Sequence, residues 1–228
     1  MTPNEGALEQ KLDMTENARS AHNARSRISE ALLFAGNFIR HPHMLGSIIP
    51  SSRFLVDRVL APIDWEWARV IVEYGPGVGT FTREILRRMR SDARLIAIET
   101  NRDFVQFLRA CLPDPRLHVA LDSAAEVGAV LQSLGLAPAQ YIVSGIPLGS
   151  MPVPVRLDIV DKTRAALEPS GAFLVYQFTA RVLPQLRQSF GHVHRSFERR
   201  NLPPAQLFVC ATPQHATEAK ARRRFGNR

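Results

Sequence analysis

The chain has 228 residues, a length that fits one full domain or one domain with an appendage. Apolar side chains make up 45% and charged side chains 22%, near the average for globular proteins, which excludes collagen-like, wholly disordered and disulfide-scaffold classes. The net charge of +8 comes entirely from residues 171–228, which hold ten basic and two acidic side chains. This basic last quarter predicts an anionic partner: nucleic acid, a membrane surface or a charged substrate.

The N-terminal part of the chain is expected to form a polar tail followed by amphipathic helices. Residues 1–27 are polar and lack the apolar stretch and cleavage site of a secretory signal, so they should be a flexible tail. Between Ile28 and Arg40, apolar residues recur every three or four positions, as in a membrane-interface helix or, equally, in a helix that covers a core. Pro42 ends this helix, and a second one is expected over Arg53–Leu60. Residues 28–60 would then cover the substrate and cofactor.

Residues 61–213 read as one α/β domain. Short β-branched runs alternate with amphipathic segments, which indicates a mostly parallel sheet with helices on both faces. Residues 214–228 are basic, lack an apolar period and should form a disordered tail. The expected strands are Val70–Tyr74, Leu95–Glu99, Leu117–Leu121, Tyr141–Ser144, Ala172–Phe178, His192–Phe197 and Gln206–Ala211. The expected helices between them are Thr80–Arg90, Asp103–Leu112, Glu126–Leu134, Val155–Leu167 and Ala180–Phe190.

The sequence predicts neither a membrane span nor a metal site. No stretch approaches the roughly 20 apolar residues needed to cross a bilayer, so any membrane contact would be peripheral. Cys111 and Cys210 lie far apart and lack the paired spacing of metal ligands, which is typical of inert core thiols in a reduced cytosolic protein.

The most specific motif is a glycine-rich turn at residues 73–80 (EYGPGVGT), between the first strand and the first helix of the α/β domain. Glycines permit a tight turn and let backbone N–H groups approach a ligand that a Cβ would exclude. Phe81 and Thr82 stand where a dinucleotide-binding loop would have its third glycine, which favours S-adenosylmethionine over NAD. The expected cofactor-binding residues of this motif are Glu73, which would anchor the cofactor's ammonium group, with Gly75, Gly77, Gly79 and Thr80.

Two more acidic residues follow the next two strands. Glu99 ends the second strand, where a carboxylate can accept hydrogen bonds from ribose hydroxyls, although a solvated or capping acid gives the same pattern. Asp122, with Ser123 beside it, could accept from the adenine amine or cap the following helix. Because all three acids follow parallel strands, they are expected at the carboxyl edge, where such sheets bind ligands.

Four segments carry a family resemblance: residues 46–52 (GSIIPSS), 73–82 (EYGPGVGTFT), 144–147 (SGIP) and 176–179 (YQFT). With them the chain resembles class I S-adenosylmethionine-dependent methyltransferases from about residue 30 to 212. Among them it is similar to the bacterial soluble phospholipid N-methyltransferases, which resemble the ribosomal RNA adenine dimethyltransferases. The resemblance implies a seven-stranded Rossmann-like sheet with an antiparallel last strand and an N-terminal amphipathic helix that docks on the bilayer.

The motif after the fourth strand separates the lipid enzymes from the RNA enzymes. The RNA relatives have an Asn or Asp, a proline-containing pair and then an aromatic residue that stacks on a flipped base. Here residues 144–148 read SGIPL, without the amide and without the aromatic residue. The chain also ends soon after the seventh strand, which would leave no helical domain to grip RNA. Both departures favour an aliphatic amine as the methyl acceptor.

The acceptor amine must be aligned and deprotonated. Methyl transfer from a sulfonium is an in-line displacement, and a primary amine with a pKa of about 10 must first lose a proton. Candidates for this role are Tyr176, Ser144, His41 and His43. The two histidines flank a proline in a linker and could also be merely exposed. Tyr176 is favoured because its hydroxyl can bind the amine and its ring can stabilise a cationic product, although a core aromatic residue is equally consistent. Ser51 would bind the cofactor's carboxylate or cap the next helix.

The sequence therefore predicts a cytoplasmic enzyme, peripherally bound to the inner face of the cell membrane, that uses S-adenosylmethionine. It would methylate the amino headgroup of phosphatidylethanolamine and its methylated intermediates toward phosphatidylcholine. The Ile28–Arg40 segment and the basic C-terminal region would bind the anionic membrane surface. The alternatives are an RNA adenine N-methyltransferase and a non-catalytic protein that binds S-adenosylmethionine or membranes.

Overall fold

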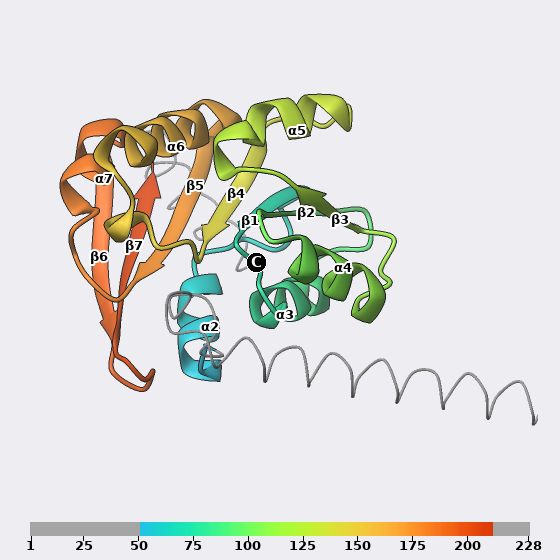
Figure 1. Ribbon diagram of the computed structural model, residues 1–228, viewed down its shortest axis with the longest axis horizontal. Coiled ribbons are helices and arrows are strands. Elements are labelled where there is room, and N and C mark those ends of the chain that lie inside the picture. Colours follow the sequence, from blue (N-terminus) through green and yellow to red (C-terminus); the bar gives the residue numbers. More distant parts are fainter. Residues whose placement is uncertain (1–50, 212–228) are drawn as a thin grey trace, which may run out of the picture. The chain divides into compact units, whose positions relative to one another are not determined.

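A seven-stranded sheet forms the centre of the fold. The computed structural model describes residues 51–211 (Figure 1). The strands lie in the order β3-β2-β1-β4-β5-β7-β6, with β1 to β5 parallel and β7 antiparallel to both of its neighbours. This arrangement confirms the predicted Rossmann-like sheet with an antiparallel last strand. The strands are β1 Val70–Tyr74, β2 Arg94–Glu99, β3 Leu117–Leu121, β4 Ala139–Ser144, β5 Leu167–Gln177, β6 His192–Glu198 and β7 Ala205–Ala211.

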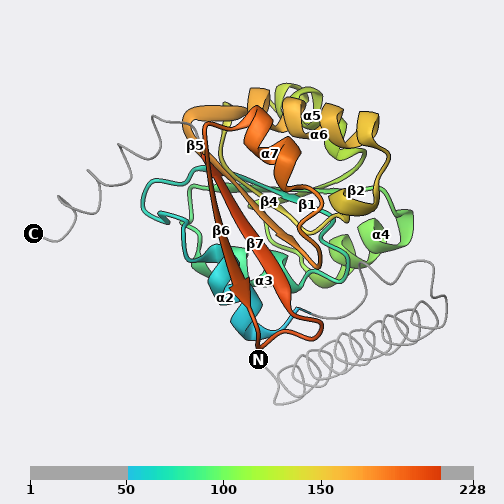
Figure 2. The ribbon, with the colours of Figure 1, turned by 90° about the vertical axis from the view of Figure 1, so that its left-hand side faces the viewer.

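Helices cover both faces of the sheet. The helices α2, α3 and α4 lie on one side of it, and α5, α6 and α7 lie on the other (Figures 1 and 2). Each was predicted from the sequence, with ends that differ by up to three residues because helix termini are weakly determined by periodicity. The helices are α2 Arg53–Leu60, α3 Thr80–Arg88, α4 Arg102–Cys111, α5 Val127–Ser133, α6 Val153–Ala166 and α7 Leu183–Ser189, with short 3-10 turns η2 Ala124–Glu126 and η3 Leu148–Ser150.

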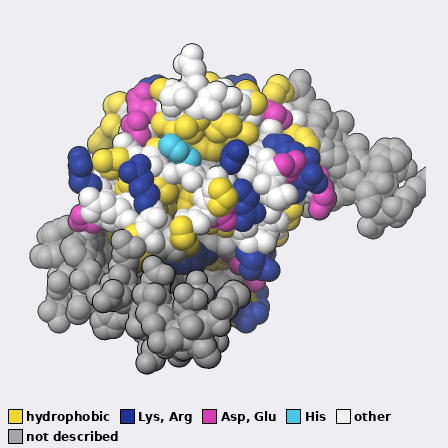
Figure 3. All heavy atoms as spheres, turned by 90° about the vertical axis from the view of Figure 1, so that its right-hand side faces the viewer, with side chains coloured by type: hydrophobic (Ala, Val, Ile, Leu, Met, Phe, Trp, Pro, Cys, Tyr) yellow, Lys and Arg dark blue, Asp and Glu magenta, His cyan; other side chains and the backbone are white. Residues whose placement is uncertain are grey.

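The β3 side of the molecule carries a mixed surface. β3 is an edge strand, and His118 and Leu121 on it are exposed. Apolar, basic and acidic side chains are interspersed over this side (Figure 3). No single sign of charge therefore dominates it.

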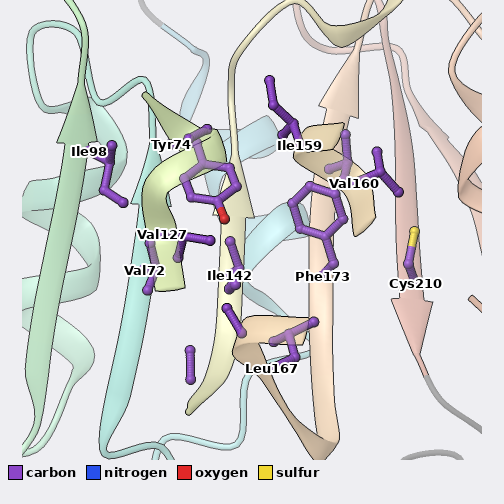
Figure 4. Close-up of a cluster of buried hydrophobic side chains, with 14 of the residues drawn as sticks. Val72, Tyr74, Ile98, Val127, Ile142, Ile159, Val160, Leu167, Phe173 and Cys210 are labelled. Carbon is purple, nitrogen blue, oxygen red and sulfur yellow. The ribbon is translucent and has the colours of Figure 1, made fainter. Parts of the chain in front are cut away.

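The central strands are buried on both faces. Ile71 and Tyr141 pack with residues of α2 and α3, whereas Val72, Ile142 and Phe173 pack with residues of α5, α6 and α7. Burial on both faces explains why these strands read as continuous apolar runs in the sequence rather than as alternating ones. Figure 4 shows the second cluster, in which the sheet residues meet Val127 of α5, Ile159 and Val160 of α6 and Cys210 of β7.

Strand β5 begins five residues earlier than the sequence predicts, at Leu167 rather than Ala172. The pairing with β4 shifts register here, because Ala139 faces Leu167 and Tyr141 faces Ala172. Four residues of β5 are thus accommodated against one residue of β4. A Cβ on Gly171 would lie 3.0 Å from the backbone oxygen of Ala139, so this irregularity needs glycine. Because residues 168–171 (EPSG) are not an apolar run, the hydrophobicity pattern does not indicate that the strand begins at Leu167.

Helix α2 packs against one face of the sheet and contributes to the hydrophobic core there. Leu55 and Leu60 are fully buried in the cluster that contains Ile71 and Tyr141. Ser52 caps the helix, since its hydroxyl oxygen accepts a hydrogen bond from the Leu55 amide at 3.2 Å. The expected helix at Ile28–Arg40 and the expected tails at 1–27 and 214–228 lie outside the described residues. Between residues 51 and 211, no helix is long and apolar enough to cross a bilayer.

Candidate active site

The sequence motifs meet at the carboxyl edge of the sheet. Backbone hydrogen bonds tie the strand ends together there: the Gly75 amide donates to Ile98, the Gly145 amide to Tyr74, and the Asp122 amide to Glu99, each at 3.0 Å. The loops that follow β1, β2, β3 and β4 are thus joined into one surface. This edge is where open α/β sheets bind their ligands.

The glycine-rich turn has a backbone that other residues rarely adopt. Gly75, Gly77 and Gly79 all have positive φ angles, of 66°, 54° and 78°. A Cβ on Gly75 would lie only 2.7 Å from Cγ2 of Ile146, which belongs to the loop after β4. The turn therefore packs directly against the loop after β4, and a side chain at Gly75 would force the two segments apart. It ends at Thr80, the half-buried first residue of α3.

Glu99 lies at the tip of β2, beside this turn. Its Oε2 accepts a hydrogen bond from the Gly77 amide at 3.2 Å, and its Oε1 accepts one from the Asn101 amide at 2.9 Å. Each carboxylate oxygen has a second lone pair, so the side chain can still accept from two hydroxyl groups. A ribose diol has that donor pair, and the position fits the role that the sequence predicts.

Glu73 lies beneath the turn and is only 3% exposed. Its Oε2 accepts a hydrogen bond from the Thr82 hydroxyl at 2.7 Å. Burial raises the pKa of Glu73 to about 8, and the charge of nearby Glu99 acts in the same direction. Thr82 was not among the predicted site residues. Its spacing from Glu73 carries no recognisable signal, because the two meet only when the turn folds back over the strand.

The buried carboxyl group of Glu73 predicts a pH-dependent stability. Its pKa is raised from 4.5 to about 8 in the folded chain, so the protonated form is favoured by folding. That stabilisation is fully present below pH 4.5 and is lost as the pH rises through 8. Urea unfolding at a series of pH values should therefore show the unfolding free energy of the wild type falling from pH 5 to 8 relative to Glu73→Gln.

Glu84→Gln is the matched control for this experiment. Bonds from Arg87 and Arg88 lower the pKa of Glu84 to about 2, so its contribution changes only at acid pH. This variant should follow the wild-type slope between pH 5 and 8. If Glu73→Gln follows that slope as well, the proposed titration of Glu73 is wrong.

Tyr176 and Gly145 are packed against each other. A Cβ on Gly145 would lie 2.5 Å from the Tyr176 hydroxyl oxygen, so only glycine leaves room for the phenol. The Tyr176 ring stacks on Phe81 of α3, with ring centroids 5.0 Å apart, and its hydroxyl is hydrogen-bonded to the side chain of Ser51. Burial raises the pKa of Tyr176 to about 12, with the Ser51 bond opposing and the Glu73 charge adding to this shift. Tyr176 therefore stays protonated at neutral pH.

Ser144, at the end of β4, is fully buried. Its hydroxyl group has no hydrogen-bond partner among residues 51–211. A buried hydroxyl without a partner costs free energy, so a ligand group that reaches it would gain a bond that the protein alone does not supply.

Gln177 holds the loop after β4 in place, a role the sequence did not predict. Its Nε2 donates to the backbone oxygens of Ile146 at 2.7 Å and Tyr176 at 2.8 Å. Its Oε1 accepts from the Gly149 amide at 3.1 Å. The only sequence signal was its place in the 176–179 motif, beside Tyr176.

The remaining predicted residues have simpler surroundings. Asp122 is exposed, and its Oδ1 accepts from the Ser123 amide at 2.7 Å. The capping role falls to Ser123, whose hydroxyl oxygen accepts from the Ala125 amide at 3.2 Å at the start of η2. His43 lies outside the described residues. Over the described part of the chain, no cluster of His, Cys, Asp and Glu could hold a metal ion.

Comparison with known proteins adds independent evidence, although no family model matches the chain. The ornithine lipid N-methyltransferase of Singulisphaera acidiphila is 34% identical over 185 residues, which cover 80% of this chain and 96% of that protein. The ribosomal RNA small subunit methyltransferase A of Laribacter hongkongensis is 36% identical over 64 residues, 28% of this chain and 23% of that protein.

Solved structures share the fold. The precorrin-6y C5,15-methyltransferase of Geobacter metallireducens has a TM-score of 0.56 at 16% identity, covering 69% of this chain and 87% of that one. Human methyltransferase-like protein 13, solved in complex with SAH, has a TM-score of 0.53 at 16% identity, covering 75% of this chain and 89% of that one.

The glycine-rich turn, the acid at the tip of β2 and the Ser144 hydroxyl, which has no partner among the described residues, fit S-adenosylmethionine as the cofactor. The identity to the Singulisphaera enzyme extends over nearly all of that protein, and the sheet order agrees with the predicted methyltransferase topology. The chain is an S-adenosylmethionine-dependent class I methyltransferase and belongs to the family of the ornithine lipid N-methyltransferase of Singulisphaera acidiphila.

Proposed function

We propose that the enzyme transfers methyl groups from S-adenosylmethionine to the primary amine of a membrane lipid headgroup. The relationship to an ornithine lipid N-methyltransferase carries this proposal. The loop after β4 supports it, because Leu148 is fully buried in the core where RNA-modifying relatives are expected to present an aromatic residue to a base. Phosphatidylethanolamine and its methylated intermediates are the substrates we propose, with ornithine lipid as the second candidate that the relative suggests.

The residues at the carboxyl edge of the sheet would bind S-adenosylmethionine and the lipid amine and align them for reaction. Bound S-adenosylmethionine supplies a methyl group on a positively charged sulfur, and the amine nitrogen must approach in line with that bond. The glycine-rich turn and Glu99 would hold the cofactor, and Gln177 fixes the loop that borders it. Tyr176 keeps its own proton at neutral pH, so we assign it to orienting the amine, and the amine's proton passes to solvent.

Replacing Tyr176 with phenylalanine should lower kcat about tenfold, the size of effect expected when one orienting hydrogen bond is lost. The Kd for the cofactor should stay within about twofold of the wild type, since the ring and its stacking on Phe81 remain. Because the pKa of Tyr176 is about 12, the pH dependence of kcat between pH 7 and 10 should be the same in both proteins.

Tyr74→Phe is the control for the loss of a buried hydroxyl. Tyr74 hydrogen-bonds Thr163 of α6 at 3.1 Å on the other face of the sheet, so this change should affect stability rather than kcat. An unchanged kcat in Tyr176→Phe would remove the phenol from the mechanism.

The substrate is tested by incubating the enzyme with methyl-labelled cofactor and, separately, phosphatidylethanolamine vesicles, ornithine lipid vesicles or ribosomal RNA. Label in phosphatidylethanolamine is the expected result. If only ornithine lipid is labelled, the enzyme is a lipid N-methyltransferase as proposed, but phosphatidylethanolamine is not its substrate. Label in RNA alone would overturn the proposal.

An enzyme that methylates a membrane lipid must act at the membrane surface. The Ile28–Arg40 helix and residues 212–228 of the basic C-terminal region, both predicted to dock, lie outside the described residues. Deletion of residues 1–40 followed by vesicle sedimentation tests the first of them, and retained binding would shift the role to the C-terminal part.

A further inference from the structure

The β6–β7 hairpin projects beyond the other strands at the carboxyl edge of the sheet (Figures 1 and 2). β6 runs in the same direction as β5, so the turn that connects it to β7 lies at the edge that carries the candidate active site. Leu202 in this turn is 82% exposed, the highest value among the large exposed apolar residues of the described chain. Pro203 and Pro204 beside it are also exposed. An apolar side chain held out in water at a turn favours a partner that can bury it.

Arginines surround this apolar tip. Arg199 and Arg200 in the turn and Arg53 on α2 are exposed. The Arg200 guanidinium lies 4.1 Å from the centroid of the Phe54 ring, and that of Arg53 lies 5.5 Å from it, so the helix and the turn form one patch. We call Arg53, Phe54, Arg199, Arg200 and Leu202 the hairpin surface.

The acidic side chains of these elements are already engaged. Glu198 is 3% exposed and accepts hydrogen bonds from the Arg200 amide at 2.8 Å and from its Nε at 3.3 Å. Asp57, the acidic residue of α2, is paired with Arg88 of α3. The hairpin surface therefore presents cations and apolar groups, in contrast to the mixed charges beside β3 (Figure 3).

Hydrogen bonds connect the hairpin surface to the candidate active site. The buried Asn201 accepts from the Ser52 amide at 2.9 Å through Oδ1 and donates to the Pro203 oxygen at 2.8 Å through Nδ2. These bonds fix the turn against the start of α2. The preceding residue, Ser51, is hydrogen-bonded to the hydroxyl of Tyr176. Ser52 therefore contacts the hairpin turn and the adjacent Ser51 contacts the Tyr176 hydroxyl, which places the hairpin turn next to the candidate active site.

We propose that the hairpin surface docks on an anionic phospholipid bilayer, with Leu202 inserted among the headgroups and the arginines against lipid phosphates. The proposal rests on the proposed function and names the surface that brings the active site to its substrate. Apolar groups ringed by cations match the chemistry of a bilayer interface, where buried apolar area and attraction to anionic lipid act together. The lipid amine would then enter beside Ser51 and Tyr176.

The test measures flotation of the full chain with phosphatidylcholine vesicles that contain about 30% phosphatidylglycerol, a strongly anionic surface. Leu202→Asp should weaken binding about tenfold or more, because an apolar side chain can no longer be buried. Ala137→Asp, at an exposed site before β4 on the opposite edge, is the matched control for the added charge and should bind as the wild type does within about twofold.

A second pair of variants tests the cations. Arg53→Gln with Arg199→Gln should weaken binding roughly thirtyfold, about fivefold for each arginine at an anionic surface. Neither side chain is paired with a carboxylate in the described residues, so both changes should be tolerated by the fold. Arg164→Gln with Arg187→Gln, on exposed positions of α6 and α7, removes the same net charge elsewhere and should lower binding far less.

Wild-type binding by the hairpin variants, with unchanged thermal unfolding midpoints, would overturn the proposal. An equal loss in the control pair would also overturn it, because net charge rather than this surface would then explain binding. Weaker RNA binding with unchanged vesicle binding would assign the surface to RNA instead. Methyl transfer by the unaltered enzyme to lipid in detergent micelles tests the proposed function separately, since it requires no bilayer.

Discussion

Replacing Gly75 with alanine should weaken binding of the cofactor about a hundredfold, or roughly 3 kcal/mol. Two costs add at this position. The φ angle of 66° is unfavourable for a residue with a Cβ, and that Cβ would lie 2.7 Å from Cγ2 of Ile146. Cγ2 can move only by rotation about χ1, which is stiff in a β-branched residue such as Ile146, so we expect the turn or the β4 loop to shift. Calorimetric titration with S-adenosylhomocysteine measures the effect.

Gly128→Ala is the control for a glycine substitution as such. Gly128 lies in α5, and a Cβ there would have no atom within 4 Å, so this variant should bind the cofactor normally. Adding Ile146→Ala to Gly75→Ala separates the two costs, since it removes the collision and leaves the backbone strain. Affinity within threefold of wild type in Gly75→Ala would mean that the turn does not hold the cofactor.

Replacing Gly145 with alanine should lower kcat roughly a hundredfold, because misplacing a reacting group by about 1 Å has effects of this size. The new Cβ would lie 2.5 Å from the hydroxyl oxygen of Tyr176 and 3.0 Å from its Cζ. The phenol cannot easily retreat, since it stacks on Phe81 and is hydrogen-bonded to Ser51. Steady-state kinetics on the lipid substrate, with cofactor Kd measured in parallel, separates displacement of the phenol from loss of the cofactor.

A double-mutant cycle that combines Gly145→Ala with Tyr176→Phe tests whether the collision with the Tyr176 hydroxyl causes the loss of kcat. Without the hydroxyl, the shortest contact is gone, so Gly145→Ala should cost clearly less in the Tyr176→Phe background than in the wild type. Gly149→Ala in the same loop should have a smaller effect, because its nearest neighbour is the rotatable hydroxyl of Thr179 at 3.1 Å. Additive losses would argue that Gly145 acts independently of Tyr176.

Elements with a strong local pattern were predictable from the sequence. β1 and β3 have the predicted bounds residue for residue, and α2 does as well. The two strands are mainly apolar runs bounded by charged or glycine residues, and α2 is an amphipathic helix that begins after the capping residue Ser52. The start of β5 was missed because residues 168–171 (EPSG) do not form an apolar run, and only the pairing of Leu167 with Ala139 places the strand's beginning there.

The chemistry of the candidate site was only partly predictable. Glu99 and the glycine-rich turn lie together at the expected edge, since strand order in a parallel sheet brings successive strand ends side by side. The contacts of Tyr176 with Ser51 and Gly145 were not predictable, because they join residues far apart in the chain. Asn201 gave no signal at all, although it links the hairpin turn to Ser52 at a separation of 149 residues.

The amino-acid sequence by itself determined the α/β class, the seven strands and the cofactor loop, because periodicity and glycine spacing are local properties of the chain. The family came from the resemblance of its motifs to known methyltransferases. Only the tertiary structure decided that Tyr176 is a partly buried phenol held between Phe81 and Ser51, and that Thr82 and Gln177 support the loops around it. It also placed Arg199 and Arg200, two arginines of the basic last quarter, in the turn beside the exposed Leu202 at the active-site edge, with Arg200 stacked on Phe54 of α2. Such groupings depend on strand order and packing, which bring distant residues together and which no local pattern encodes.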